Sequence, residues 1–138
     1  MSKYLNFKLN FNDPKTTEKT VIISNEPYII QSFLQIPLYD NFNVKIGYEA
    51  SDAYVQQVEE NKYSVRVKTT YNFINGNSSI NWQYNFLSNT ESIIYPSDIP
   101  IASNITSTTG VYFGKTGVIS IKAYDSGLRE VTVGFNFN

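Results

Sequence analysis

Apolar and polar residues alternate one by one through most of this chain. In five segments apolar residues recur at every second position, with Thr69 as the one polar exception, and these are 4–11, 42–50, 63–73, 80–87 and 131–137. A period of two is the period of a β-strand, because successive side chains point to opposite faces of a sheet. One apolar and one polar face per strand is typical of antiparallel sheets that cover a core on one side. The alternation therefore predicts an all-β chain.

Two turn sequences predict which strand residues pair. Asn75-Gly76 tolerates the positive φ angles of a tight hairpin, and Asp125-Ser126-Gly127 places a glycine at the left-handed position of a three-residue loop. Directly opposed residues point to the same face of a sheet. Both turns bring apolar faces together, with the pairs Tyr71 and Ile80, Thr69 and Trp82, Val67 and Tyr84, Val65 and Phe86, Ala123 and Arg129, Ile121 and Val131, and Ile119 and Val133.

Two further strands are predicted at 20–24 and 28–38, and the second contains Pro37, which suits an edge or a bulge. Residues 88–110 are the least regular part of the chain, because two prolines interrupt any ladder there and Ser, Thr and Asn dominate afterwards. We expect a long connection over this range, with at most a short edge strand at 93–95.

The segment 51–60 has two readings. It suits a short helix capped by Ser51, or a strand at 53–58 that leads into a turn at 59–62. The Tyr-Ser-Val-Arg-Val that follows begins a new alternating run, and this favours the strand and its hairpin.

These elements predict a single domain over residues 1–138, folded as an antiparallel β-sandwich of about 8–9 strands, of the jelly-roll or immunoglobulin-like kind. A closed barrel is the alternative. The terminal Val-Gly-Phe-Asn-Phe is similar to the last strand of outer-membrane barrels. No export signal precedes the first strand, however, and the aromatic residues do not form two girdles.

Histidine and cysteine are both absent from the chain. This excludes the Ser-His-Asp triad, a cysteine nucleophile and ordinary zinc sites. The carboxylates fall almost entirely in turns or on predicted polar faces, where we expect solvated surface charge. Two carboxylate pairs, Glu49 with Asp52 and Glu59 with Glu60, are candidates for a calcium site in a loop. Neither pair belongs to the ligand spacing of an EF-hand. We therefore predict no catalytic residue, no cofactor and no metal, and expect no enzymatic activity.

The 11 basic residues are spread along the chain, and the net charge is −1. Nucleic-acid binding usually needs a basic stripe, so we expect no nucleic acid as a partner. No apolar stretch of membrane-spanning length occurs, and no apolar leader precedes the first strand, so we expect synthesis in the cytoplasm and no membrane partner. The absence of disulfides fits that expectation.

The aromatic residues divide into core and contact candidates. Trp82 shares its apolar face with Ile80 and Tyr84, and core packing is a better reading than a platform for a sugar ring. Large amphipathic side chains near loops or strand ends suit contacts with a partner. The partner-binding candidates are Tyr28, Tyr39, Tyr54, Tyr95 and Tyr112, and the alternative is that they cover the strand ends of their own domain.

The predicted polar faces carry Asn, Gln, Ser and Thr more than Lys and Glu. Monomers usually place charges on exposed strands to prevent association, so these faces favour contact with other subunits. We accordingly predict a homo-oligomeric or structural assembly protein. Its most concrete form is a phage or viral virion component: a tail, baseplate, fibre or capsid-decorating subunit. An AT-rich genome gives a similar composition without assembly.

A carbohydrate- or cell-surface-binding module, either lectin-like or a receptor-binding domain, is the alternative function. The stretch from Phe42 to Phe86, with Ile80-Asn81-Trp82, resembles the strand pattern of H-type lectins over less than half of the chain. That resemblance implies a possible glycan partner. It carries no binding residue across, because it depends on alternation and one tryptophan.

Overall fold

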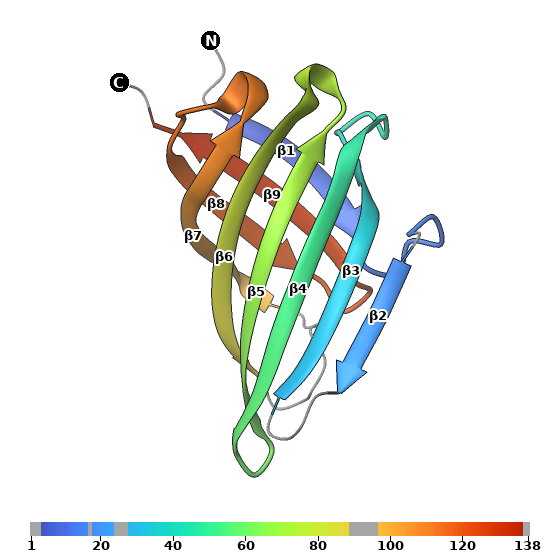
Figure 1. Cartoon of the computed structure of the whole chain (residues 1–138), viewed down its shortest axis with the longest axis vertical. Coiled ribbons are helices and arrows are strands. Elements are labelled where there is room, and N and C mark those ends of the chain that lie inside the picture. Colours follow the sequence, from blue (N-terminus) through green and yellow to red (C-terminus); the bar gives the residue numbers. More distant parts are fainter. Residues whose placement is uncertain (1–3, 17, 24–27, 89–96, 137–138) are drawn as a thin grey trace.

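A computed structural model describes residues 4–16, 18–23, 28–88 and 97–136. Its strands and two 3-10 turns are shown in Figure 1. In chain order they are β1 (Tyr4–Asn10), β2 (Glu18–Ile23), β3 (Tyr28–Tyr39), β4 (Lys45–Glu59), β5 (Lys62–Phe73), η1 (Asn75–Asn77), β6 (Ser78–Ser88), β7 (Ser97–Thr109), η2 (Gly110–Tyr112), β8 (Gly117–Ala123) and β9 (Leu128–Phe135). Within the described ranges, no helix is long and apolar enough to cross a bilayer.

Eight of these strands close into a barrel. Neighbours pair in the order β1, β9, β8, β7, β6, β5, β4, β3, and the ring is completed where Lys8 of β1 pairs with Tyr39 of β3. Every pairing is antiparallel, so consecutive strands run up and down around the barrel. The predicted β-sandwich is therefore wrong, and the closed barrel replaces it.

A bulge divides β3 into two parts that pair with different strands. The register against β4 shifts between Phe33 and Ile36, and Gln35 lies there with a positive φ of 58°. Before the bulge β3 pairs with β2, and after it the end of β3 meets β1. Bulges bend strands and end pairings in this way. β2 therefore lies outside the closed ring.

Both predicted hairpin registers are confirmed. β5 and β6 pair with Tyr71 opposite Ile80 and Thr69 opposite Trp82, and β8 and β9 pair with Ile121 opposite Val131. The loop between β5 and β6 spans four residues, 74–77, rather than two, with Gly76 at a φ of 70°. Lengthening the loop by one residue on each side leaves the pairing unchanged.

One segment differs from the prediction, and the ambiguity of another is resolved. The range read as a long connection holds β7, a full barrel strand, while the expected edge strand at 93–95 lies outside the described residues. Pro100 falls within β7 where its register against β8 shifts, so the proline is accommodated by an irregularity. For 51–60, the strand reading is confirmed, and it forms one continuous strand with the residues before it.

The apolar faces of the strands meet inside the barrel. Phe7 packs edge-on against Tyr71, with ring centroids 4.9 Å apart, and against Phe73 at 5.6 Å. Edge-to-face contacts of this kind favour a fixed arrangement of the rings. Further side chains of the buried cluster come from strands around the barrel: Leu9, Ile36, Leu38, Val55, Val65, Val67, Ile119, Ile121, Val131 and Val133. The core therefore fills much of the barrel interior.

Candidate functional site

The inner face of β4 carries polar side chains where the sequence predicted a solvated face. The alternation in 42–50 suggests that Ile46, Tyr48 and Ala50 point inward, but Gly47 and Glu49 are the buried residues. The reason is the length of β4, whose inward positions continue without a break through Ser51. Glu49 pairs with Tyr71 of β5 and with Ile36 of β3, which are both buried residues of the core.

Three buried oxygens on this wall of the barrel have no hydrogen-bond partner among the described groups. They are Oε2 of Glu49, Oγ of Ser51 and Oγ1 of Thr69. Ser51 and Thr69 lie directly opposite each other on β4 and β5, and Glu49 is the next inward residue along β4. Buried polar groups are nearly always hydrogen-bonded to protein or to another molecule. The three oxygens therefore form a polar patch that is suited to a bound molecule or water.

Burial raises the pKa of the Glu49 carboxyl to about 8, because the barrel interior removes water from the charged form. The guanidinium of Arg129 lowers this pKa in part, and the Thr69 hydroxyl lowers it further. The Thr69 hydroxyl is close enough to favour the charged carboxylate, although its oxygen makes no hydrogen bond of normal geometry. Burial has the largest effect, so Glu49 carries its proton at neutral pH.

Arg129 is the second acidic or basic side chain buried in the described interior, and it is fully buried. Its Nη1 donates hydrogen bonds to the backbone oxygens of Tyr124, at 3.1 Å, and Leu128, at 2.9 Å. Its guanidinium lies over the ring of Phe11, 4.7 Å from the centroid. These contacts hold a positive charge inside the barrel, and this charge disfavours a cationic guest.

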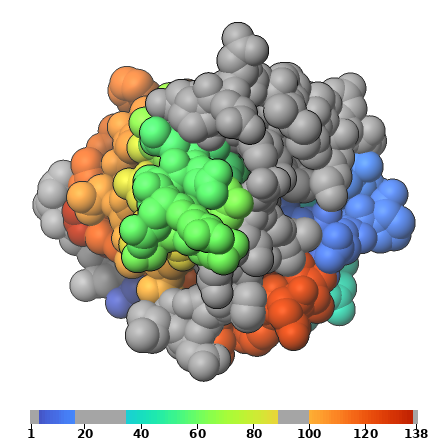
Figure 2. All heavy atoms as spheres, turned by 90° about the horizontal axis from the view of Figure 1, so that it is seen from below, coloured from blue at the N-terminus to red at the C-terminus, as the bar shows by residue number. Residues whose placement is uncertain are grey.

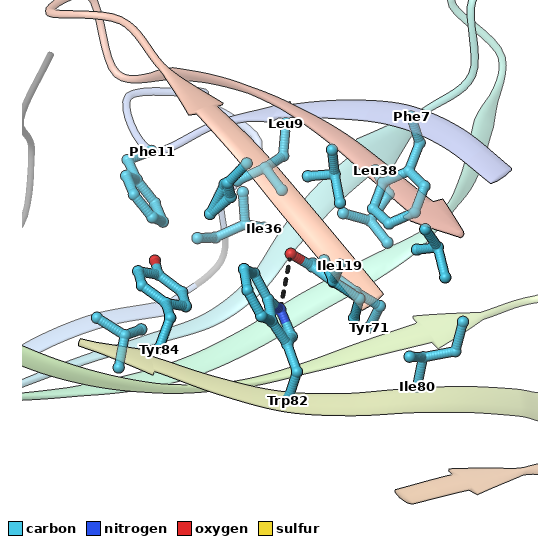
Figure 3. Packing of buried hydrophobic residues seen from close by; sticks show 14 of the residues in the cluster. Phe7, Leu9, Phe11, Ile36, Leu38, Tyr71, Ile80, Trp82, Tyr84 and Ile119 are labelled. Atoms are coloured by element: carbon cyan, nitrogen blue, oxygen red, sulfur yellow. Dashed lines mark hydrogen bonds between the residues drawn. The ribbon is translucent and has the colours of Figure 1, made fainter. Parts of the chain in front are cut away.

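Aromatic side chains of β5 and β6 point into the barrel interior, as Figure 3 shows for Tyr71, Trp82 and Tyr84. Nε1 of Trp82 donates a hydrogen bond of 3.1 Å to the hydroxyl of Tyr71. The Trp82 ring lies against Tyr84, with centroids 4.6 Å apart and planes inclined by 31°. The prediction that Trp82 belongs to the core is confirmed, since only 1% of it is exposed. Together these rings form an aromatic, weakly polar wall.

The tyrosines proposed for partner contacts do not form one site. Tyr54 lies on the outer face of β4, with Arg66 and Lys68 near its ring. Tyr112 packs inward at one end of the barrel, with its ring 5.5 Å from those of Phe73 and Phe135. Burial raises the pKa of the Tyr112 hydroxyl. Tyr112 therefore covers its own core.

The remaining three tyrosines add little to a common site. Tyr39 is half-buried where β3 meets β1. Its pairing with Lys8 completes the ring of barrel strands. Tyr28 begins β3, but its side chain is outside the described part of the structure, as is the whole of Tyr95. Partner binding by these residues stays a prediction.

Two open hollows lie on the outer face of β4, β5 and β6. One of about 450 Å³ includes Asp52, Lys68, Thr70 and Asn81 in its lining. The other, of about 440 Å³, is lined by Tyr54, Gln56, Ser64, Arg66, Gln83 and Asn85. Both are open to solvent, and the second is the more polar of the two. The lining of the first hollow also includes Ser51, Thr69 and Trp82, so this hollow lies behind the strand positions that carry the interior polar patch.

Carboxylates do not gather into a metal site in the described ranges, where no group of three or more His, Cys, Asp or Glu side chains is present. Glu49 and Asp52, which the sequence suggested as a calcium pair, are three positions apart on one strand and so point to opposite faces. Glu49 is instead the residue that the sequence reading missed. The sequence did contain a signal for this. Glu49 precedes Ala53 and Val55 by an even number of positions, so the three side chains point to the same face of β4.

Comparisons with known proteins give a likeness of fold. No protein-family model matches the sequence, and no curated protein sequence matches it significantly. Among solved structures, the chain is similar to pyocyanin demethylase, with a TM-score of 0.66 and 12% sequence identity. The match covers 96% of this chain and 99% of the other. At this identity the likeness shows the fold alone.

This likeness contradicts the function predicted from the sequence. The virion component and its alternative, a carbohydrate- or surface-binding module, assumed a non-enzymatic sandwich. The chain instead has a closed barrel, and a protein named as an enzyme has the same fold over nearly its whole length. This comparison contradicts the expectation of a non-enzymatic virion sandwich, so that expectation is not carried further, and the likeness assigns no activity to this chain.

Proposed function

We propose that the protein binds a small planar molecule inside its barrel, against the wall formed by Trp82 and Tyr71. The observation that carries this proposal is the patch of buried oxygens on Glu49, Ser51 and Thr69, which have no hydrogen-bond partner among the described groups. Eight-stranded barrels have an interior of the size that holds side chains or one small ligand. A ligand that hydrogen-bonds to the patch would remove the cost of burying these oxygens.

The chemistry of the patch restricts the ligand. A carboxyl group with a pKa of about 8 is a hydrogen-bond donor at neutral pH, as are the two hydroxyls beside it. Arg129 adds a positive charge to the interior. The site therefore favours a neutral or anionic ring that carries a carbonyl oxygen or a ring nitrogen as acceptor. Pyocyanin, the compound in the neighbour's name, and the smaller 4-quinolone are suitable probes.

Fluorescence of Trp82 tests the proposal directly, because it is the only tryptophan of the chain and lies on the proposed wall. Titration with either probe should change its emission saturably. Thr69→Val should weaken binding about tenfold, because it removes one hydroxyl without changing the volume. Thr70→Val is the matched control, since Thr70 lies on the outer face beside Asn81. An emission that neither probe changes would exclude planar acceptors of this kind.

The raised pKa of Glu49 supports a second candidate function, an enzyme that transfers protons to and from its bound ligand. A buried carboxyl that titrates near neutral pH can both donate and accept a proton. The test is hydrogen–deuterium exchange of 4-quinolone in D₂O, followed by NMR with and without the protein. Glu49→Gln should retain binding but abolish any acceleration, because an amide hydrogen-bonds without giving up a proton. If the wild type does not accelerate the exchange, proton transfer is excluded and ligand binding is the only function that remains proposed.

A further inference from the structure

Three loops at one end of the barrel expose large apolar side chains. The up-and-down order places the β3–β4, β5–β6 and β7–β8 connections at the same end, at the top of Figure 1. The exposed fractions there are 86% for Phe42, 57% for Val44, 63% for Ile74, 59% for Val111 and 81% for Phe113. These five residues are called the apolar end below. Clusters of exposed apolar residues usually mark contacts with proteins or membranes.

The loop that carries Phe42 and Val44 has a defined structure. Oδ1 of Asp40 accepts hydrogen bonds from the backbone nitrogens of Phe42, at 2.8 Å, and Val44, at 3.0 Å. Asn43, between them, has a positive φ of 62°, a conformation that asparagine tolerates well. The turn therefore holds the exposed phenylalanine at its tip.

The other two loops are joined to each other. Oγ of Ser78 accepts a hydrogen bond of 2.9 Å from the nitrogen of Val111 and donates one of 3.2 Å to the oxygen of Gly76. A side chain at Gly76 would lie 2.8 Å from the Val111 side chain, so the loops are in close contact. Ile74 and Phe113 thus extend from one connected unit.

Charge differs between the two ends of the barrel. Among the described residues, the loops of the apolar end and the strand ends next to them carry Lys45 and Lys115, against the single carboxylate of Asp40, which is engaged in its turn. The described loops of the opposite end, which Figure 2 views, and the strand residues that flank the β4–β5 turn carry four carboxylates and two lysines: Asp13, Glu59, Glu60, Asp125, Lys15 and Lys62. An anionic surface would therefore attract the apolar end and repel the other.

We propose that the apolar end docks the protein onto an anionic lipid surface, with Phe42 and Phe113 inserted between lipid headgroups and Lys45 and Lys115 facing the anionic lipids. Aromatic rings suit this interface, which is apolar on one side and wet on the other. Lysines close to an anionic surface add attraction that salt weakens. The inference is independent of ligand binding inside the barrel.

Co-sedimentation with vesicles tests the proposal on the full chain. Vesicles of equal molar parts phosphatidylcholine and phosphatidylserine should bind the protein, and phosphatidylcholine alone should bind it more weakly. Phe42→Ala with Phe113→Ala should reduce binding to mixed vesicles about tenfold for each ring removed. Leu87→Ala is the matched control, because Leu87 is 68% exposed where β6 ends, at the opposite end of the barrel. It should leave binding unchanged.

A second pair of measurements separates insertion from charge attraction. Phe113→Trp adds an indole at the loop tip, and its emission should shift to shorter wavelength with mixed vesicles, whereas the emission of buried Trp82 should not. Lys45→Gln with Lys115→Gln should weaken binding to mixed vesicles and leave binding to phosphatidylcholine unchanged. Unfolding midpoints close to that of the wild type will show that the variants fold.

Three results would overturn the proposal. The first is a wild-type protein that does not sediment with mixed vesicles. The second is equal binding by the wild type and the variant with both phenylalanines replaced, which would place any contact elsewhere. The third is a dimer that light scattering detects without vesicles and that is absent in the variant with both phenylalanines replaced. In that case a second copy of the chain would cover the apolar end.

Discussion

Inside the barrel, Nε1 of Trp82 donates a hydrogen bond of 3.1 Å to the hydroxyl of Tyr71, and both residues are almost completely buried. Trp82 belongs to β6 and Tyr71 to the neighbouring β5, so the bond joins two large buried side chains across adjacent strands. Water cannot easily replace either partner in such a position, and the bond therefore has consequences that can be measured.

Tyr71→Phe should reduce the free energy of unfolding by about 1–3 kcal/mol, because it leaves the buried Trp82 N–H without its partner. Urea unfolding followed by circular dichroism measures this loss, and the emission of Trp82 should change in the folded state as well. Tyr54→Phe is the control, since it removes a hydroxyl from the outer face of β4. An equal loss in both variants would contradict a specific role for the bond.

Stability should fall as pH rises through the range in which Glu49 loses its proton. Its pKa is raised from 4.5 to about 8 in the folded protein, so the folded state holds a proton that the unfolded state has released. The stabilisation is complete below about pH 4.5 and is lost as pH approaches 8, at roughly 1 kcal/mol per pH unit. Urea unfolding at a series of pH values measures this slope.

Glu49→Gln should remove that slope, because the amide does not titrate. The variant should be more stable than the wild type at pH 8, where the wild type has to bury a charged carboxylate. Glu60→Gln, in the exposed turn between β4 and β5, should leave the slope unchanged. If the wild type and Glu49→Gln show the same pH dependence, Glu49 does not carry the proton.

Gly47→Ala should destabilise the barrel by about 3 kcal/mol, because a Cβ there would lie 1.9 Å from the backbone oxygen of Asn72. The strands would have to separate where β4 pairs with the end of β5. Gly134→Ala is the control, since its Cβ would meet nothing nearer than 3.4 Å and its φ is not positive. Thermal unfolding should show a clear drop for the first and a change within about 0.5 kcal/mol for the second.

Asp40→Ala should loosen the turn that holds Phe42, because it removes both hydrogen bonds from Oδ1 to the turn nitrogens. We expect a loss of about 1 kcal/mol in stability and weaker binding to phosphatidylserine vesicles, although the removed charge is negative. Asp125→Ala, in the β8–β9 turn at the opposite end, should not weaken vesicle binding. Stronger vesicle binding by Asp40→Ala would show that charge outweighs the shape of the turn.

Local pairing was predictable wherever a short turn joined two alternating strands. The register of β5 against β6 follows from the turn near Asn75-Gly76, and that of β8 against β9 follows from Gly127, which has a φ of 92°. In such hairpins the side chains that meet depend on whether the number of loop residues is even or odd, and the turn sequence indicates which it is.

The inward position of Glu49 was not predictable in the same way. The register of β4 against β5 shifts between Gln57 and Glu59, next to their hairpin turn. Without that shift, a two-residue turn would oppose Val55 to Arg66 rather than to Val65. No residue in the turn marks the extra position, so the phase of β4, and the burial of Glu49 with it, depends on how the apolar side chains pack.

The sequence by itself determined that the chain is built from antiparallel strands with one apolar face, because a period of two is a local property of neighbouring residues. Only the tertiary structure decided that the sheet closes, through the pairing of Lys8 with Tyr39 and the bulge at Gln35. Closure depends on strand tilt and on the stagger between strands far apart in the chain. That same closure surrounds Glu49 and removes it from water, so the candidate site arises from tertiary structure.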